Sequence, residues 1–228
     1  MNKKKKILVI VGKSCSGKDT LIEKVNELLE KVSLPKLTAC VTYTTRPKRE
    51  TETNYKEHIF VDSAEFSKIY DKELVAGTMI AYTSIDTYEY MTTLEYLNKS
   101  DIVILDPGGY KQLKDELSDR LDIYCIYIEA SITTRTNRAL KRCKNNDELD
   151  KYFSRELYES TMMFPAYREP DENGYFVESE HLCRIVTDDD SEPEYGYLKR
   201  VIEFLFDTLY NNKSEFKDSI LKHIPSVS

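Results

Sequence analysis

The sequence predicts an α/β fold in which helices cover both faces of a parallel sheet. The first indication is the run from Ile7 to Val11, which contains only β-branched and aliphatic residues. Such an uninterrupted apolar run is typical of a strand buried on both faces of a parallel sheet. The second indication is that similar short apolar runs alternate with segments of helical spacing, which is the order of βαβ units.

The individual elements follow from the same patterns. Residues 12–18 form a turn, and the apolar residues between Thr20 and Val32 recur at helical spacing. We expect further buried strands at Ile102 to Leu105, Ile123 to Ile128 and Arg184 to Val186. We expect the remaining helices at residues 109–118, 131–143, 148–164 and 193–211.

The stretch from Thr42 to Leu97 breaks this alternation, because it is rich in threonine, tyrosine and charged residues. We interpret it as an inserted subdomain of small strands with a helix from Ser63 to Tyr70. We therefore predict one domain over residues 1–228, with its core at 1–41, 98–130 and 183–211, the insertion at 42–97, a helical region at 131–165 and a peripheral tail at 212–228. Ile220 and Leu221 are expected to form a short docking helix in that tail.

Composition excludes several classes of protein. A hydrophobic fraction of 40% in 228 residues is enough for a core, and a net charge of -7 argues against a nucleic-acid-binding face. The five cysteines show no CxxC spacing, which indicates free thiols in a reducing compartment. The first apolar run is too short for a signal peptide, and no run is long enough to span a membrane. We expect a soluble cytoplasmic protein, a monomer or homodimer, with neither nucleic acid nor membrane as partner.

A phosphate-binding motif lies between the first strand and the first helix. The sequence pattern G-x-x-x-x-G-K is matched by Gly12, Lys13, Ser14, Cys15, Ser16, Gly17 and Lys18. Glycine allows the backbone to turn tightly and to direct its N–H groups at phosphate oxygens, and the helix N-terminus adds partial positive charge. Lys18 supplies a mobile charge for the β- and γ-phosphates. By itself the motif predicts a P-loop NTPase fold that binds a nucleoside triphosphate, and the rest of the chain must choose among kinases, GTPases and motor ATPases.

One position departs from the motif. Asp19 stands where a serine or threonine hydroxyl binds magnesium, and Thr20 follows it. A carboxylate can bind Mg²⁺ directly or through water. We therefore predict an ATP site at residues 12–20 with Asp19 as a metal ligand. The structural alternative is a strand–turn–helix junction that happens to carry two glycines and a lysine.

A second anion site is indicated by Arg46 and Arg49, three residues apart and close to Pro47. Two guanidinium groups beside a proline that restricts the backbone suit bidentate capture of a phosphate. Taken without other information, the same residues also fit a solvated basic turn.

The chain from Ile7 to about Leu209 resembles the guanylate kinase family of nucleoside monophosphate kinases. The family pattern Ser-x-Thr-Thr-Arg-x-Pro-Arg, followed by Tyr-x-Phe-Val, corresponds here to Thr42-Tyr43-Thr44-Thr45-Arg46-Pro47-Lys48-Arg49 and His58-Ile59-Phe60-Val61. The resemblance implies Mg²⁺–ATP as donor, a nucleotide as acceptor, an acceptor-binding insertion at 42–97 and a lid at 131–165. It implies that the acceptor phosphate is held by Arg46 and Arg49, with Thr42 in place of the serine and His58 in place of the tyrosine.

The resemblance extends to other parts of the site. Tyr90 and Thr92 match a Tyr-Gly-Ser/Thr segment that reaches the acceptor's phosphate and base, and Asp106 matches the first aspartate of Leu-Asp-x-Asp. A carboxylate at the C-terminal end of a strand is well placed to associate with magnesium. The lid arginines that close over the transferring phosphoryl group are matched by Arg138, Arg142 and Arg155, and Thr187 stands near the adenine position. From spacing alone, these arginines also fit a charged helix face.

Both carboxylates that read guanine in the family are replaced. Ala81 lies nine residues before Tyr90, at the position where the family has a glutamate. Gly108 occupies the position of the second aspartate of Leu-Asp-x-Asp. We therefore predict that GMP is not strongly preferred, unless backbone groups or side chains such as Ser84 or Asp86 supply the missing acceptors. The alternatives are a ribose 1,5-bisphosphate phosphokinase, whose family shares Gly-Lys-Asp and Thr-Arg-Pro segments, and a non-catalytic guanylate-kinase-like interaction domain, in which the P-loop is typically degenerate.

Overall fold

The computed structural model describes residues 4–50, 52–56, 58–85, 87–162, 164, 179, 181–188, 196–210 and 214–224. The chain forms two compact units. The first comprises Met1–Val9 and Thr38–Ile123, and the second comprises Ile10–Leu37 and Tyr124–Ser228. The division into core, insertion, lid and tail stays a prediction, and each unit is described by itself.

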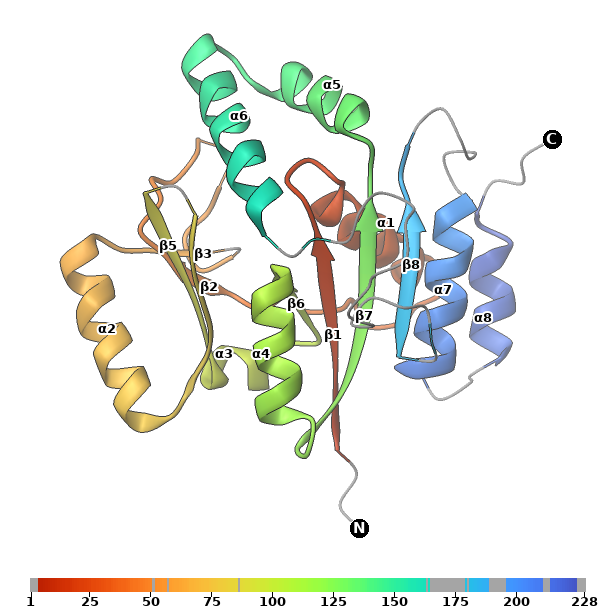
Figure 1. Cartoon of the computed structure of the whole chain (residues 1–228). Helices are drawn as coiled ribbons and strands as arrows, with labels where there is room; N and C mark the ends of the chain where they lie inside the picture. The colour runs from red at the N-terminus through yellow and green to blue at the C-terminus, as the bar shows by residue number, and fades with distance from the viewer. Residues whose placement is uncertain are drawn as a thin grey trace. The chain divides into compact units, whose positions relative to one another are not determined.

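The main sheet has four strands in the order β6-β1-β7-β8 (Figure 1). Their bounds are β1 (Lys5–Gly12), β6 (Ile102–Leu105), β7 (Leu121–Glu129) and β8 (Leu182–Val186). Strands β7 and β8 are parallel, and each residue from Ile7 to Val11 of β1 is at most 1% exposed. This burial confirms the predicted strand, because an apolar run of this kind requires cover on both faces.

The predicted helices are present with shifted ends. They are α1 (Lys18–Lys31), α4 (Pro107–Leu117), α5 (Ile132–Arg142), α6 (Asn146–Thr161), α7 (Gly196–Thr208) and α8 (Ser214–Leu221). Helix α1 begins two residues earlier than predicted, since the last residue of the P-loop is already helical. Ile220 is fully buried in α8, which contacts α1 and α7, so the expected docking helix is confirmed. Within the described ranges, no helix is both long and apolar enough to cross a bilayer. Residues 163, 193–195 and 211–213, which include predicted helix ends and the start of the tail, lie outside the described residues.

The insertion forms a second sheet in the order β3-β2-β5-β4, within the first unit. Its strands are β2 (Thr42–Thr44), β3 (His58–Phe60), β4 (Met79–Ile85) and β5 (Tyr88–Thr93), followed by α3 (Leu94–Asn98). The predicted helix at Ser63 is α2 (Ser63–Ala76), which starts where Asp62 accepts the Glu65 N–H at 2.8 Å. It continues past the predicted end at Tyr70, because the first residue to adopt a left-handed conformation is Gly77.

Helices α2 and α4 cover opposite faces of strand β4 (Figure 1). Tyr82 points to the α2 face, where its ring lies 5.1 Å from that of Tyr70. Ala81 points to the other face, and a methyl group placed on Gly109 of α4 would lie 3.4 Å from its Cβ. Successive side chains of a strand alternate between faces. The register of this sheet therefore decides which side chains lie together on the face away from α2.

Candidate active site

The predicted site residues belong to both units. The second unit holds the P-loop and its flanking residues, the three lid arginines and Thr187. The first unit holds the acceptor residues and Asp106. The two half-sites are described separately below.

The P-loop conformation depends on its two glycines. Gly17 has φ 100°, in the left-handed region, and its carbonyl accepts the first helical hydrogen bond, from Leu21, at 2.9 Å. A Cβ on Gly12 would lie only 2.7 Å from the carbonyl oxygen of Ile128 in β7. The loop can therefore turn and pack against the sheet only with glycine at both positions.

Cys15 adopts the same backbone region without being a glycine, with φ 61°. A Cβ is unfavourable in this region, so the P-loop carries local backbone strain at this residue. Burial raises the pKa of the half-buried Cys15 thiol above its usual value, although Arg142 and Lys18 act in the opposite direction. Cys15 is therefore a strained residue with an uncharged thiol at neutral pH.

Lys18 is half-buried, and its ammonium group is directed at the loop itself. Its Nζ donates to the carbonyl oxygens of Gly12 at 2.8 Å and Lys13 at 3.0 Å. Burial lowers the pKa of Lys18, and the nearby carboxylates of Glu159 and Asp19 oppose this effect. Asp19 and Thr20 are exposed in the first turn of α1. The carboxylate oxygens of Asp19 are the type of ligand that Mg²⁺ prefers.

Glu159 is a residue of this half-site that the sequence did not indicate. It lies near the end of α6 and is 4% exposed. Its carboxylate accepts hydrogen bonds from both the N–H and the hydroxyl of Ser14 in the P-loop, at 2.8 and 2.6 Å. It also accepts one from Nε of Arg155 at 3.3 Å. Only the i, i+4 spacing of Arg155 and Glu159 was visible in the sequence, and that spacing says nothing about the P-loop.

Arg138 joins the lid helix α5 to the P-loop. Its guanidinium donates to the carbonyl oxygens of Cys15 and Ser16, at 3.3 and 3.1 Å, and to the backbone carbonyl of Thr187. The Thr187 hydroxyl is buried and donates to the Ser16 carbonyl at 2.7 Å. Arg142 is exposed at the end of α5. Arg138 and Thr187 thus lie at the predicted ATP site, while the catalytic role of the lid arginines stays a prediction.

The two lid helices are joined by a buried ion pair that the sequence analysis did not identify. Arg135 of α5 is 4% exposed and donates through both terminal nitrogens to Glu156 of α6, one bond measuring 2.8 Å. Burial alone would lower the pKa of Arg135, but the hydrogen bonds and charge of Glu156 raise it. Lys13 of the P-loop lies 3.8 Å from the same carboxylate.

In the acceptor half-site, Arg46 is bound to a carboxylate. It is 9% exposed, and its two terminal nitrogens donate to the two oxygens of Glu52 at 3.0 and 2.7 Å. The backbone N–H of Arg49 donates to Glu52 at 2.8 Å, and the exposed Arg49 guanidinium lies 3.5 Å from it. Burial opposes the ionisation of Glu52, but these contacts outweigh it and lower its pKa. Glu52, which the sequence did not indicate, thus lies between the two predicted arginines and contacts both.

Most of the predicted acceptor residues share one face of the second sheet, which we call the hydroxyl face. Strand register places Thr44, Tyr90 and Thr83 in one row, and Thr92 beside Ala81. The parallel pairing of β2 with β3 adds the pair formed by Thr42 and His58, which are hydrogen-bonded to each other at 2.7 Å. The ring of His58 lies 6.1 Å from that of Tyr90, and Arg46 lies 5.3 Å from the centre of the Phe60 ring. The register therefore brings together Thr42, Arg46, His58, Ala81, Tyr90 and Thr92.

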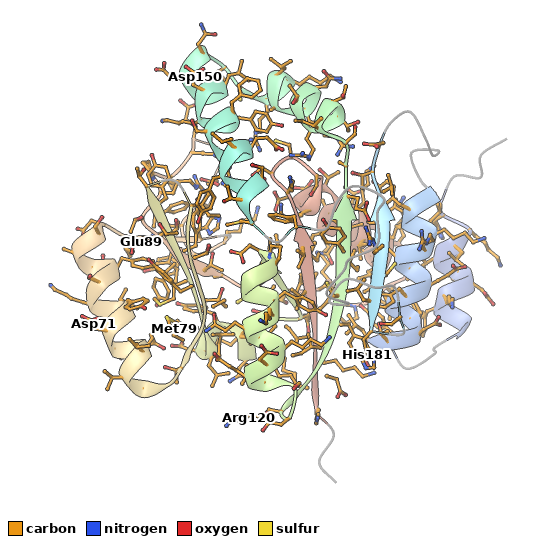
Figure 2. All side chains as sticks on the ribbon, viewed as in Figure 1. Asp71, Met79, Glu89, Arg120, Asp150 and His181 are labelled. Atoms are coloured by element: carbon orange, nitrogen blue, oxygen red, sulfur yellow. The ribbon has the colours of Figure 1, made fainter. Side chains whose placement is uncertain are left out.

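The hydroxyl face corrects one sequence-based expectation. Ser84 pairs with Glu89 (labelled in Figure 2) on the opposite face, toward α2, so it does not supply an acceptor beside Ala81. Thr83, its neighbour in the chain, lies on the hydroxyl face and was overlooked. An alternation count from Ala81 would have identified it. Asp86, the other suggested acceptor, lies outside the described residues.

Asp106 has a structural role at the start of α4. Its Oδ1 accepts the Gly109 N–H at 2.8 Å, the contact of an N-cap, so one carboxylate oxygen is engaged within the chain. Ala81 is 6% exposed beside this turn. No group of three or more His, Cys, Asp or Glu side chains suited to a metal occurs in the part of the chain that the structure describes. The metal roles of Asp19 and Asp106 stay predictions.

Comparisons with known proteins point to one family. A family model described as guanylate kinase matches residues 4–203. A guanylate kinase of Prochlorococcus marinus is 38% identical over 166 residues, covering 63% of this chain and 85% of the relative. That of Malacoplasma penetrans is 32% identical over 146 residues, covering 61% and 70%. The crystal structure of guanylate kinase from Anaplasma phagocytophilum matches with a TM-score of 0.51 at 16% identity, covering 98% and 96%, and supports the fold alone.

The strain at Cys15 leads to a stability prediction. Cys15→Gly should raise the free energy of unfolding by about 0.5–1 kcal/mol, because glycine adopts φ 61° without a Cβ penalty but loses more entropy on folding. Urea denaturation followed by circular dichroism measures the change. Cys143→Gly, at the C-cap of α5 with φ -70°, has no such strain to relieve and should destabilise. A loss of stability in Cys15→Gly would show that contacts of the thiol outweigh the backbone strain.

Proposed function

Because the chain belongs to the guanylate kinase family, we propose that it transfers the γ-phosphoryl group of ATP to a nucleoside monophosphate. Strand β4 contributes no carboxylate that would select the base of this acceptor. The family makes it an ATP-dependent nucleotide kinase. The observation that carries the acceptor assignment is the hydroxyl face, on which the predicted residues gather beside an arginine pair that already binds a carboxylate. The cytoplasmic location expected from the sequence is part of this proposal.

The donor half-site supports ATP binding by the P-loop. Its backbone N–H groups lie at the N-terminus of α1, where the helix dipole favours anions, and Lys18 is within the same loop. Asp19 is the candidate to hold Mg²⁺, and Asp106 would contribute through the oxygen that does not cap α4. When bound, magnesium would neutralise charge on the β- and γ-phosphates.

In the acceptor half-site, the phosphate of the monophosphate would replace the carboxylate of Glu52. Arg46 is held rigidly by burial and by its position over Phe60, so its bidentate donor pair is already oriented. Tyr90 and His58 lie beside it on the hydroxyl face and would donate further hydrogen bonds. Catalysis would then consist of positioning and charge neutralisation, with the lid arginines acting on the transferring group.

The base would meet hydroxyl groups. Ala81 offers no polar atom, while Thr92 and Thr83 lie on the same face and can each donate or accept a hydrogen bond. A hydroxyl has a single oxygen, so it cannot make the two parallel hydrogen bonds with which the two oxygens of a carboxylate accept both donors of the guanine edge. Selection by such a face should be weak.

The test is a coupled assay of ATP turnover with each ribo- and deoxynucleoside monophosphate and with ribose 1,5-bisphosphate. We expect turnover with several monophosphates and a GMP preference below about 200-fold, the range that a site without a specific acceptor achieves. Turnover with ribose 1,5-bisphosphate alone would replace the proposal with the sugar-phosphate kinase alternative. ATP binding without turnover of any acceptor would favour the non-catalytic alternative.

The two phosphate sites should respond separately to mutation. Arg46→Ala should raise the KM of the acceptor about 10–150-fold, because it removes a charge-assisted bidentate contact, and should leave the KM of ATP unchanged. Lys18→Ala should abolish turnover without unfolding the protein. Lys48→Ala is the matched control for Arg46→Ala, because Lys48 is an exposed basic residue two positions further along the same loop as Arg46. Equal increases in both KM values for Arg46→Ala would place this arginine outside the acceptor site.

The alternation along β4 gives an internal control for the acceptor face. Thr83→Val replaces the hydroxyl with a methyl group of similar size and should lower kcat/KM for the monophosphate about 2–10-fold, the worth of one neutral hydrogen bond. Ser84→Ala, one residue away on the opposite face, should change nothing. The KM of ATP should be unaffected in both variants. Identical kinetics for the two variants would mean that the acceptor does not contact the hydroxyl face at Thr83.

A further inference from the structure

The P-loop already binds an anion that belongs to the chain. The Ser14 N–H and the Ser14 hydroxyl both donate to the carboxylate of Glu159, at 2.8 and 2.6 Å. Backbone N–H groups of a P-loop are the groups that bind phosphate oxygens in a nucleotide. A carboxylate resembles part of a phosphate group, because both offer two or more oxygens that carry negative charge.

The surroundings of Glu159 strengthen this comparison. Its side chain is 4% exposed, it accepts a hydrogen bond from Arg155, and its charge acts on Lys18. A phosphate bound to the loop would meet the same cations. A buried carboxylate is costly unless its charge is compensated, and here Ser14, Arg155 and Lys18 provide the compensation.

We propose that Glu159 and the nucleotide's phosphate compete for the N–H of Ser14, so that Glu159 must leave the P-loop before a triphosphate is fully seated. One N–H cannot make a full hydrogen bond to two anions at once, so the two states exclude each other. Release of Glu159 also breaks its hydrogen bond with the Nε of Arg155. This inference rests on the proposed role of the P-loop as the ATP site.

The competition has a consequence for ligand choice. A ligand displaces Glu159 only if its phosphate bonds replace those that the carboxylate makes to Ser14. Ligands that place a phosphate against Ser14 lose affinity to this competition, whereas adenosine loses none. Removing the carboxylate should therefore strengthen the binding of phosphate-rich ligands selectively.

The experiment measures dissociation constants of ATP, ADP and adenosine by isothermal titration calorimetry, without acceptor. Glu159→Gln and Glu159→Asp are the test variants. Glutamine loses the charge, and aspartate keeps the charge on a side chain too short for both bonds to Ser14. We expect ATP to bind roughly 10–100-fold more tightly to Glu159→Gln, which corresponds to loss of one charge-assisted contact. Glu159→Asp should show a smaller gain, and adenosine should be unaffected in both.

The control is Asp150→Asn, which removes one negative charge from an exposed position of the same helix (Figure 2). It should leave the affinity for ATP unchanged. Unchanged or weaker ATP binding in Glu159→Gln would overturn the inference and make Glu159 a positioning residue. A gain in Glu159→Gln with none in Glu159→Asp would also overturn it, because long-range repulsion would then suffice. If neither the wild type nor any variant binds ATP, the proposed donor site itself fails.

Discussion

The structure depends on the need of the P-loop for an anion. The turn from Gly12 into α1 collects backbone N–H groups, the positive end of a helix dipole and the charge of Lys18 in one place. Grouping so many donors in a partly buried loop is costly unless a negative group satisfies them. Glu159 of α6 supplies a negative charge there: it accepts both hydrogen bonds of Ser14 and its charge acts on Lys18, and the same contact ties the end of α6 to the loop.

The acceptor half-site follows the same rule with different residues. Burying the charge of Arg46 would be costly without a partner. Glu52 accepts hydrogen bonds from both of its terminal nitrogens and from the N–H of Arg49. In both half-sites, a carboxylate of the chain therefore lies where a phosphate is proposed to bind. If a phosphate must displace this carboxylate, its observed binding free energy is the difference between the interactions of the site with phosphate and its interactions with the carboxylate.

Within the second unit, helix α5 is attached both to the P-loop and to α6. Arg138 ties α5 to carbonyl oxygens of the P-loop and to Thr187, while Arg135 and Glu156 tie α5 to α6. Separating the two charges of a buried ion pair is costly, so α5 and α6 are expected to stay together when a nucleotide binds. The contact between Glu159 and Ser14 is the one that a phosphate can replace directly.

Sequence alone predicted the strands of the main sheet, most of the helices and the P-loop, because these depend on local apolar patterns and on glycines required by backbone geometry. It also selected Arg46 and Tyr90 through short motifs, and their roles stay predictions. It did not identify Glu52, Thr83, Arg135 or Glu159, and it misplaced Ser84. Strand register decides the face of Thr83 and Ser84, and helix packing decides that Glu159, 145 residues from Ser14 in the chain, reaches the P-loop. The face of Thr83 follows from alternation along β4 once Ala81 is placed, whereas the contact of Glu159 depends on packing between distant segments, which no local pattern of residues encodes.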